Sequence, residues 1–284
     1  FLTISPLICL LLILIIGVSH GSLDNLKGKK LFQIFGIKNF FFIFYLSYIL
    51  ISIIVVIFWI IIPSITLVTF LIVASHHFGK EDTQFLIIEN SYQNQLLFFL
   101  KGMLVILAPM YFHFDETVSI FKLLLIENES FYKFLNMIET NKIILFSIIL
   151  STFSSITLFT KNFELKKFII FLDYFSILII NYFFTPLVAF TIYFCFLHSV
   201  RHSISLMFEL DKNDLINGFK IFTKKALPLT ILTATFCLIG FYLLNTTYSF
   251  DSSILKIIFI GLASLTFPHI LLEYLLEKNE KQRN

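Results

Sequence analysis

Charged residues are scarce in this sequence. Asp, Glu, Lys and Arg supply 14% of the 284 residues, whereas soluble domains average about a quarter. Hydrophobic residues supply 58%, and the mean hydropathy is +0.91. A soluble protein of this size could not bury so much Phe, Ile and Leu. The composition therefore predicts an all-α fold, a polytopic helical bundle in a membrane.

Several sequence signatures are absent as well. The three cysteines, Cys9, Cys195 and Cys237, lie in apolar segments without CxxC spacing, which argues against a disulfide framework or a zinc ribbon. The net charge of +3 is small and no basic run alternates with aromatic residues, so no nucleic-acid partner is expected. No P-loop, GxGxxG, GxSxG or HExxH motif occurs. The enzyme classes that these motifs mark are therefore disfavoured.

Long apolar segments predict nine membrane-spanning helices, with eight as the alternative. A helix needs about 20 apolar residues to cross the hydrocarbon core. Two apolar runs, 40–77 and 168–204, are too long for one span each, and Pro63 and Pro186 divide them. The expected spans are 1–20, 40–61, 63–78, 95–113, 142–160, 168–184, 186–204, 226–246 and 254–276.

We expect a single integral membrane domain over residues 1–284. Residues 115–141 mix charged and apolar residues at roughly helical spacing, which predicts an amphipathic segment at the membrane interface. Residues 277–284 form a polar tail. The apolar runs split by proline are also typical of the broken helices of transporters, so a transporter or metal carrier is the alternative function.

Four histidines lie where predicted spans end. His198 and His202 are four residues apart, so on an α-helix they share one face and can point at one metal ion. His20 and His77 end the first and third spans. Odd-numbered spans run in the same direction, so all four histidines are expected near one membrane face. Imidazole suits iron, copper and zinc, and the pattern therefore predicts a shared metal site.

Lysine and arginine indicate the orientation of the chain. Sixteen of them lie in connections on the histidine side and four on the opposite side, with Lys101 inside the fourth span left out of the count. The positive-inside rule then places the histidine side in the cytoplasm and the N-terminus outside. We expect a multi-pass protein of the cell (inner) membrane, with its metal site toward the cytoplasmic face.

Three further residues could support the metal ligands. Asp24 follows His20 by four residues, and Asp82 follows His77 by five. A histidine ligand usually donates its second N–H group to a carboxylate or a carbonyl, so the two aspartates could orient the ligands. The alternative is that both aspartates are solvated at the membrane interface. His269 lies in the last span and could line a pocket or hydrogen-bond a neighbour.

Five short motifs are spread from residue 20 to residue 269. They are His20-Gly-Ser-Leu-Asp24, His77-Phe-Gly-Lys-Glu-Asp82, Pro109-Met-Tyr-Phe-His113, His198-Ser-Val-Arg-His202 and Pro268-His269. In this order, and in a chain of this size and hydropathy, they resemble the Brp/Blh family, the bacterial and archaeal membrane β-carotene 15,15′-dioxygenases.

The resemblance implies an activity and a ligand set. It implies a non-haem Fe(2+) held by His20, His77, His198 and His202, and it selects His77 over the adjacent His76 because the family's histidine precedes Phe-Gly. It implies that O2 cleaves the central 15,15′ double bond of β-carotene within the lipid bilayer. The products would be two all-trans-retinal molecules, which a rhodopsin would use. A histidine-box desaturase or hydroxylase is disfavoured because HxxxH occurs once and HxxHH does not occur.

Overall fold

The structure is a computed structural model that describes residues 2–37, 40–83, 85–87, 91–161 and 163–281. Four residues within these ranges are described by their backbone alone: Ser19, His20, Glu280 and Lys281. Across the described ranges the chain is helical and contains no strand, apart from an isolated parallel bridge between Leu2 and Phe184. The expected all-α fold is confirmed.

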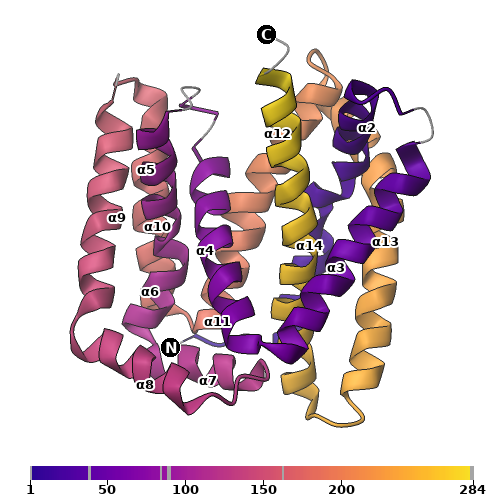
Figure 1. Ribbon diagram of the computed structural model, residues 1–284. Coiled ribbons are helices and arrows are strands. Elements are labelled where there is room, and N and C mark those ends of the chain that lie inside the picture. The colour runs from indigo at the N-terminus through magenta and orange to yellow at the C-terminus, as the bar shows by residue number, and fades with distance from the viewer. Residues whose placement is uncertain (1, 38–39, 84, 88–90, 162, 282–284) are drawn as a thin grey trace. The chain divides into compact units, whose positions relative to one another are not determined.

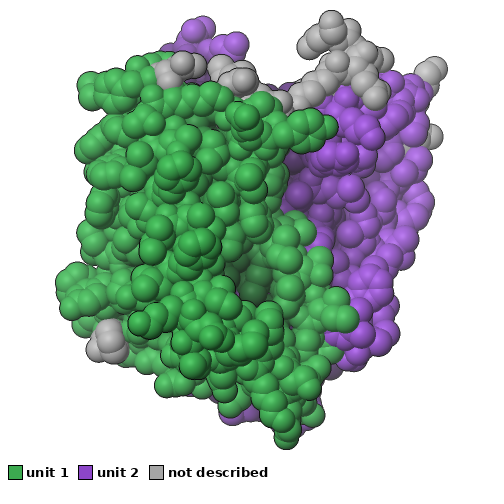
Figure 2. All heavy atoms as spheres, turned by 60° about the vertical axis from the view of Figure 1, so that its left-hand side comes forward, with its two compact units in different colours: residues 1–9, 63–198 green, residues 10–62, 199–284 purple. Residues whose placement is uncertain are grey.

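The chain divides into two compact units, which Figure 2 shows in different colours. Unit 1 comprises residues 1–9 and 63–198, and unit 2 comprises residues 10–62 and 199–284. Unit 1 contains α4 (Pro63–Glu81), α5 (Tyr92–Gly102), α6 (Leu104–Phe112), α7 (Phe114–Leu123), α8 (Glu129–Thr140), α9 (Ile143–Thr160), η3 (Leu165–Lys167), α10 (Phe168–Phe183), α11 (Pro186–Ile192) and nearly all of η4 (Tyr193–Ser199). Unit 2 contains η1 (Ile13–Gly17), η2 (Val18–Leu23), α2 (Asp24–Ile34), α3 (Phe40–Ile61), α12 (Val200–Leu210), α13 (Leu215–Leu244) and α14 (Phe250–Lys281). Helix α1 (Pro6–Leu12) contains the boundary between residues 9 and 10.

Both prolines that were expected to divide an apolar run begin a helix. Helix α3 ends at Ile61 and α4 begins at Pro63, while α10 ends at Phe183 and α11 begins at Pro186. Proline is well suited to the first turn of a helix, whereas inside a helix it removes a backbone hydrogen bond and its ring clashes with the preceding turn, which favours a break. The predicted division of both runs is confirmed.

Six helices within the described ranges are long and apolar enough to cross a membrane, or seven if the bent pair Pro6–Gly17 and Gly21–Ile34 forms one span. They are Phe40–Ile61, Tyr92–Phe112, Ile143–Thr160, Pro186–Leu210, Leu215–Leu244 and Phe250–Asn279. Each of the nine expected spans coincides with helix, but three are not among the six: the first span, which belongs to the bent pair, and the spans at α4 and α10. Helix α10 has 16 residues, which extend about 24 Å, and the last part of α4 is polar. The prediction of nine spans therefore exceeds the number of full-length apolar helices.

Unit 1 contains a close crossing between α4 and α5. A Cβ atom added to Gly79 would lie 1.8 Å from the carbonyl oxygen of Phe98, and one added to Gly102 would lie 1.8 Å from that of Ser75. Each helix thus places a glycine against the backbone of the other. Small residues at such crossings let membrane helices approach closely. The crossing holds the end of α4 that carries His77 against α5.

Hydroxyl side chains join α9 to α5. Ser154 Oγ donates a hydrogen bond of 2.5 Å to the carbonyl oxygen of Leu97, and Ser151 Oγ donates one of 3.4 Å to that of Lys101. Both serine side chains are fully buried. Hydroxyl groups in membrane helices commonly bond across to a neighbouring helix in this way.

Two short helices occupy the segment 115–141 that was expected to be amphipathic. Helices α7 and α8 lie across the end of unit 1 where α6 ends and α9 begins (Figure 1). Helix α7 buries Thr117, Val118 and Phe121, and α8 buries Leu135. Their location at a membrane interface stays a prediction.

Two apolar clusters lie among the described residues of unit 2. Leu31, Phe44 and Leu272 join α2, α3 and α14, and a second cluster joins η2, α12 and α13 through Leu23, Leu206, Phe222 and Ala226. In the most apolar stretch of α13 no residue is buried, as expected for a helix that faces lipid chains. Helix α14 continues to Lys281, so most of the expected polar tail is helical.

Candidate functional site

His198 lies in a π-helical turn within a longer helix. The turn η4 ends at Ser199, and the helix runs on both sides of it, from Pro186 to Leu210. Such turns are frequent at functional sites, because an additional residue changes the direction in which side chains point. Phe194 stacks on the imidazole with a centroid distance of 5.9 Å, and Phe78 meets it edge-on at 5.0 Å. His198 is thus enclosed by aromatic rings and is buried.

His77 of α4 lies beside His198 in unit 1. Their ring centroids are 5.6 Å apart, with 67° between the ring planes, and both side chains are buried. Two imidazoles that each bind a metal ion through one nitrogen at about 2.1 Å have centroids about 5 to 6 Å apart. The pair that the sequence predicted at one membrane face is therefore brought together, at a spacing that suits two ligands of one ion.

Asp82 fixes the orientation of His198. Its Oδ1 lies 3.0 Å from His198 Nδ1, and its Oδ2 accepts a hydrogen bond of 2.7 Å from the Tyr193 hydroxyl. A carboxylate has no hydrogen to donate, so Nδ1 donates and the lone pair of the neutral ring is on Nε2. Asp82 is 3% exposed, which shows that the solvated alternative for this residue is wrong. A carboxylate on the far nitrogen is the usual support of a histidine that binds a metal.

Lys101 also lies beside Asp82 and was not assigned a role from the sequence. Its Nζ is 4.0 Å from Asp82 Oδ2, and both side chains are 4% exposed. A buried carboxylate is costly unless a positive charge or hydrogen bonds compensate it. The sequence did contain a signal for Lys101, because a lysine inside an apolar span is rare unless it has a function. No signal in the sequence singled out Tyr193, because aromatic residues are frequent throughout the chain.

Two other histidines of unit 1 have partners of their own. His76 Nε2 lies 2.7 Å from Gln95 Oε1 in α5. His113, between α6 and α7, has its Nε2 2.7 Å from the carbonyl oxygen of Asn181. These contacts agree with the choice of His77 over His76 and with the exclusion of His113 from the ligand set.

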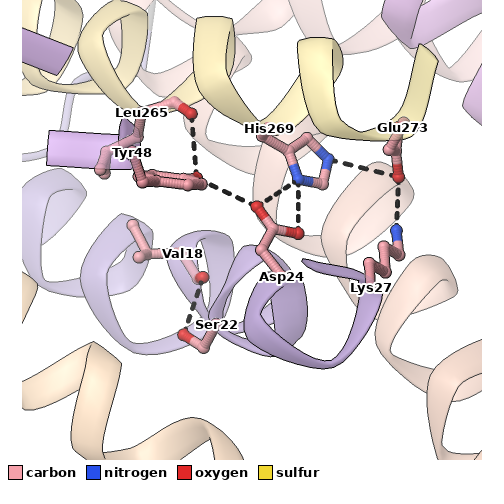
Figure 3. Close-up of polar contacts among 8 residues, drawn as sticks. All are labelled: Val18, Ser22, Asp24, Lys27, Tyr48, Leu265, His269 and Glu273. Carbon is pink, nitrogen blue, oxygen red and sulfur yellow. Dashed lines mark hydrogen bonds and ion pairs between the residues drawn. The ribbon is translucent and has the colours of Figure 1, made fainter. Parts of the chain in front are cut away.

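In unit 2, Asp24 holds His269, which is 245 residues away in the sequence. His269 Nδ1 lies 2.9 and 2.8 Å from the two Asp24 oxygens (Figure 3). Tyr48 of α3 donates a hydrogen bond of 3.0 Å to Asp24 Oδ2. Asp24 is 2% exposed, so the solvated alternative is wrong here too. The prediction that His269 hydrogen-bonds a neighbour is confirmed.

The other two expected ligands lie in unit 2. His20 is in η2, and its side chain lies outside the described part of the structure. His202 lies in α12 and is half-buried. The segments that carry them are linked, because Ser199 Oγ donates a hydrogen bond of 3.1 Å to the carbonyl oxygen of Gly17. Gly17 immediately precedes η2 and Ser199 immediately precedes α12, so this bond joins the starts of both segments.

Comparisons with known proteins agree with these observations. The profile of the family described as β-carotene 15,15′-dioxygenase matches residues 11–277. The β-carotene 15,15′-dioxygenase of uncultured marine bacterium 66A03 is 27% identical over 278 residues, which cover 93% of this chain and 90% of the relative. No solved structure matches the chain. The resemblance seen in the motifs is confirmed, and the chain belongs to the β-carotene 15,15′-dioxygenase family.

Proposed function

We propose that this protein cleaves the central 15,15′ double bond of β-carotene with O2 and releases two all-trans-retinal molecules. The proposed ligands of its iron are His20, His77, His198 and His202. The observation that carries the proposal is the buried His77–His198 pair with Asp82 on His198 Nδ1, in a chain that matches the dioxygenase family over residues 11–277.

The donor set of unit 1 suits such an ion. His77 and His198 have the spacing of two ligands of one ion, and Asp82 keeps the proton of His198 on Nδ1. Bound iron(II) would supply open coordination positions at which O2 can react. Phe78 and Phe194 cover the imidazole of His198 and exclude water from it. Exclusion of water protects an oxidising site from side reactions.

The surroundings suit an apolar substrate. β-Carotene is an apolar rod of about 30 Å, comparable to the hydrocarbon core of a bilayer. It dissolves in lipid, and apolar side chains cover the exposed faces of α3 and α13. The protein's part in the reaction is to place the midpoint of the polyene at the ligand cluster, because a bound reactant in the correct orientation reacts far faster than a dissolved one. We place the site toward the cytoplasmic face of the inner membrane, with the N-terminus outside.

The change Asp82→Asn should weaken metal binding by about 10- to 100-fold, because supporting groups of metal ligands have effects of that size. The amide keeps the shape of the side chain but loses the charge that Lys101 and His198 face. Iron content and affinity of the purified protein would be measured. Asp115→Asn on the exposed side of α7 is the matched control and should behave as native. Native iron affinity in Asp82→Asn would contradict the assigned role.

The proposed reaction can be tested in a membrane host that accumulates β-carotene. Cells expressing the native chain should lose β-carotene and gain retinal, with about two retinal molecules formed per β-carotene consumed. Under oxygen-18 gas, retinal reduced at once to retinol should carry the label, because both product oxygens come from O2. Persistence of β-carotene with well-expressed, iron-loaded protein would refute the substrate assignment, and products of unequal length would refute central cleavage.

A further inference from the structure

A series of partly buried polar groups in unit 2 extends beyond the buried Asp24–His269 pair. His269 Nε2 lies 3.6 Å from Oε1 of Glu273, one turn further along α14 (Figure 3). Lys27 of α2 forms an ion pair with the same carboxylate. The exposed fractions of the side chains are 3% for Asp24, 6% for His269 and 13% for Glu273. His269 and Glu273 lie in the long, largely apolar helix α14, where ionisable groups are costly and call for a function.

Asp24 sets the tautomer of His269. Both Asp24 oxygens lie within hydrogen-bonding distance of His269 Nδ1, and Tyr48 orients the carboxylate from the other side. Because a carboxylate accepts, Nδ1 donates, and in the neutral ring Nε2 carries the lone pair. Asp82 and His198 in unit 1 have the same arrangement. In proteins, this arrangement is the usual support of a histidine that binds a metal.

The distance between His269 Nε2 and Glu273 Oε1 suits two ligands of one ion. At 3.6 Å the two atoms are too far apart for an N–H···O hydrogen bond. An ion bound at about 2.1 Å from both atoms would hold them about 3 to 3.6 Å apart. The two residues are four positions apart on α14, so they share a face of the helix. An imidazole nitrogen with a carboxylate oxygen is a donor set for divalent iron, manganese or zinc.

The same groups also admit a purely structural interpretation, in which Lys27 and Asp24 fasten α2 to α14. The two interpretations assign opposite roles to Lys27. If these groups only hold α2 against α14, the ion pair between Lys27 and Glu273 stabilises the contact between the two helices. Removal of Lys27 should then weaken that contact. In a metal site, its ammonium group competes with the ion for the carboxylate, so its removal should leave metal binding unchanged or make it tighter.

We propose that His269 and Glu273 bind a divalent metal ion, with Asp24 as the positioning residue of His269. His269 and Glu273 would thus be metal ligands in addition to the four histidines of the proposed function. The inference rests on contacts within unit 2 and does not require β-carotene to be the substrate.

The test is metal binding by the purified, detergent-solubilised full chain after removal of bound metal, with Co2+ as the probe. We expect His269→Gln and Glu273→Gln each to weaken Co2+ binding by at least about tenfold. At saturating Co2+, both should also change the visible absorption bands of the ion, because these bands report the ligands directly. If these groups only hold the two helices together, neither change should alter the visible spectrum of the Co2+-saturated protein.

Lys27→Met is the decisive companion variant, and we expect native or tighter Co2+ affinity for it. Asp251→Asn, which removes an exposed carboxylate in the first turn of the same helix α14, is the matched control and should behave as native. Weaker Co2+ binding in Lys27→Met, or native affinity and spectrum in Glu273→Gln, would overturn the inference. His198→Ala, measured in parallel, distinguishes the His269–Glu273 inference from the four-histidine proposal. If His198→Ala loses Co2+ while Glu273→Gln binds it with native affinity, only the His269–Glu273 inference is overturned.

Discussion

His198→Ala is expected to abolish retinal formation in cells that accumulate β-carotene. Removal of a group that supports a metal ligand costs about 10- to 100-fold in affinity or activity, so loss of a ligand should cost at least about 100-fold. His198 is the expected ligand with the most complete surroundings in the described structure: Asp82 on its Nδ1 and aromatic rings around it. Retinal and β-carotene in cell extracts, with iron in the purified protein, are the quantities to measure.

His76→Ala is the matched control for this experiment. His76 is adjacent to His77 on α4 but contacts Gln95 of α5. Its loss should leave iron content near native and reduce retinal formation only modestly. If His198→Ala still forms retinal at the native rate, His198 is not a ligand. If His76→Ala is the inactive variant instead, the choice between the adjacent histidines was wrong.

Gly79→Ala is expected to have the largest effect on folding. The added Cβ would lie 1.8 Å from the Phe98 carbonyl oxygen and 2.8 Å from the Gly102 nitrogen, and both are backbone atoms that no side-chain rotation can move. Helices α4 and α5 would have to separate. Overpacking usually costs about 1 to 3 kcal/mol, and a backbone clash should reach about 3 kcal/mol or more. Thermal unfolding in detergent and the yield of folded protein would measure the loss.

The same change should also remove iron, because Gly79 is two residues after His77 and the two share the end of α4. Gly240→Ala in α13 is the control, since a Cβ there meets nothing within 4 Å. Alanine is a better helix former than glycine by about 1 kcal/mol, so this variant should be as stable as native or slightly more stable. A Gly79→Ala protein as stable as Gly240→Ala would show that the close crossing of α4 and α5 is incorrect.

Local properties of the sequence were sufficient to predict the membrane class and the two helix breaks at Pro63 and Pro186, but not every helix boundary: α13 begins at Leu215, 11 residues before the expected span. Hydropathy marks apolar helices, and the helices break at Pro63 and Pro186 because a proline ring removes a backbone hydrogen bond and disfavours continuation of the preceding helix. Pro109, Pro228 and Pro268 nevertheless lie inside helices, so a proline by itself does not fix a break. The number of full-length apolar helices was harder to predict. The apolar residues of α4 and α10 predicted membrane spans. However, α10 is short and the end of α4 is polar, so neither is a full-length apolar helix.

The choice of histidines also came from the sequence, through their positions at span ends and through short motifs. His77 and His198 were expected to be neighbours, and they are. The motifs could not show which aspartate serves which histidine. Proximity in the sequence suggested Asp24 as a support for His20 and Asp82 as a support for His77. The structure shows Asp24 at His269 and Asp82 at His198, two contacts that the sequence did not suggest.

The sequence therefore determined the class of protein, the helix breaks at Pro63 and Pro186 and the candidate ligands, because hydropathy, proline and helical spacing act over a few residues. Tertiary structure decided the partners of those ligands. Asp82 and His198 are 116 residues apart and Asp24 and His269 are 245 apart, so only the packing of distant helices brings them together. The surroundings of Lys101 and Glu273 also depend on packing, because the charged groups that face them, Asp82 and Lys27, come from other segments of the chain.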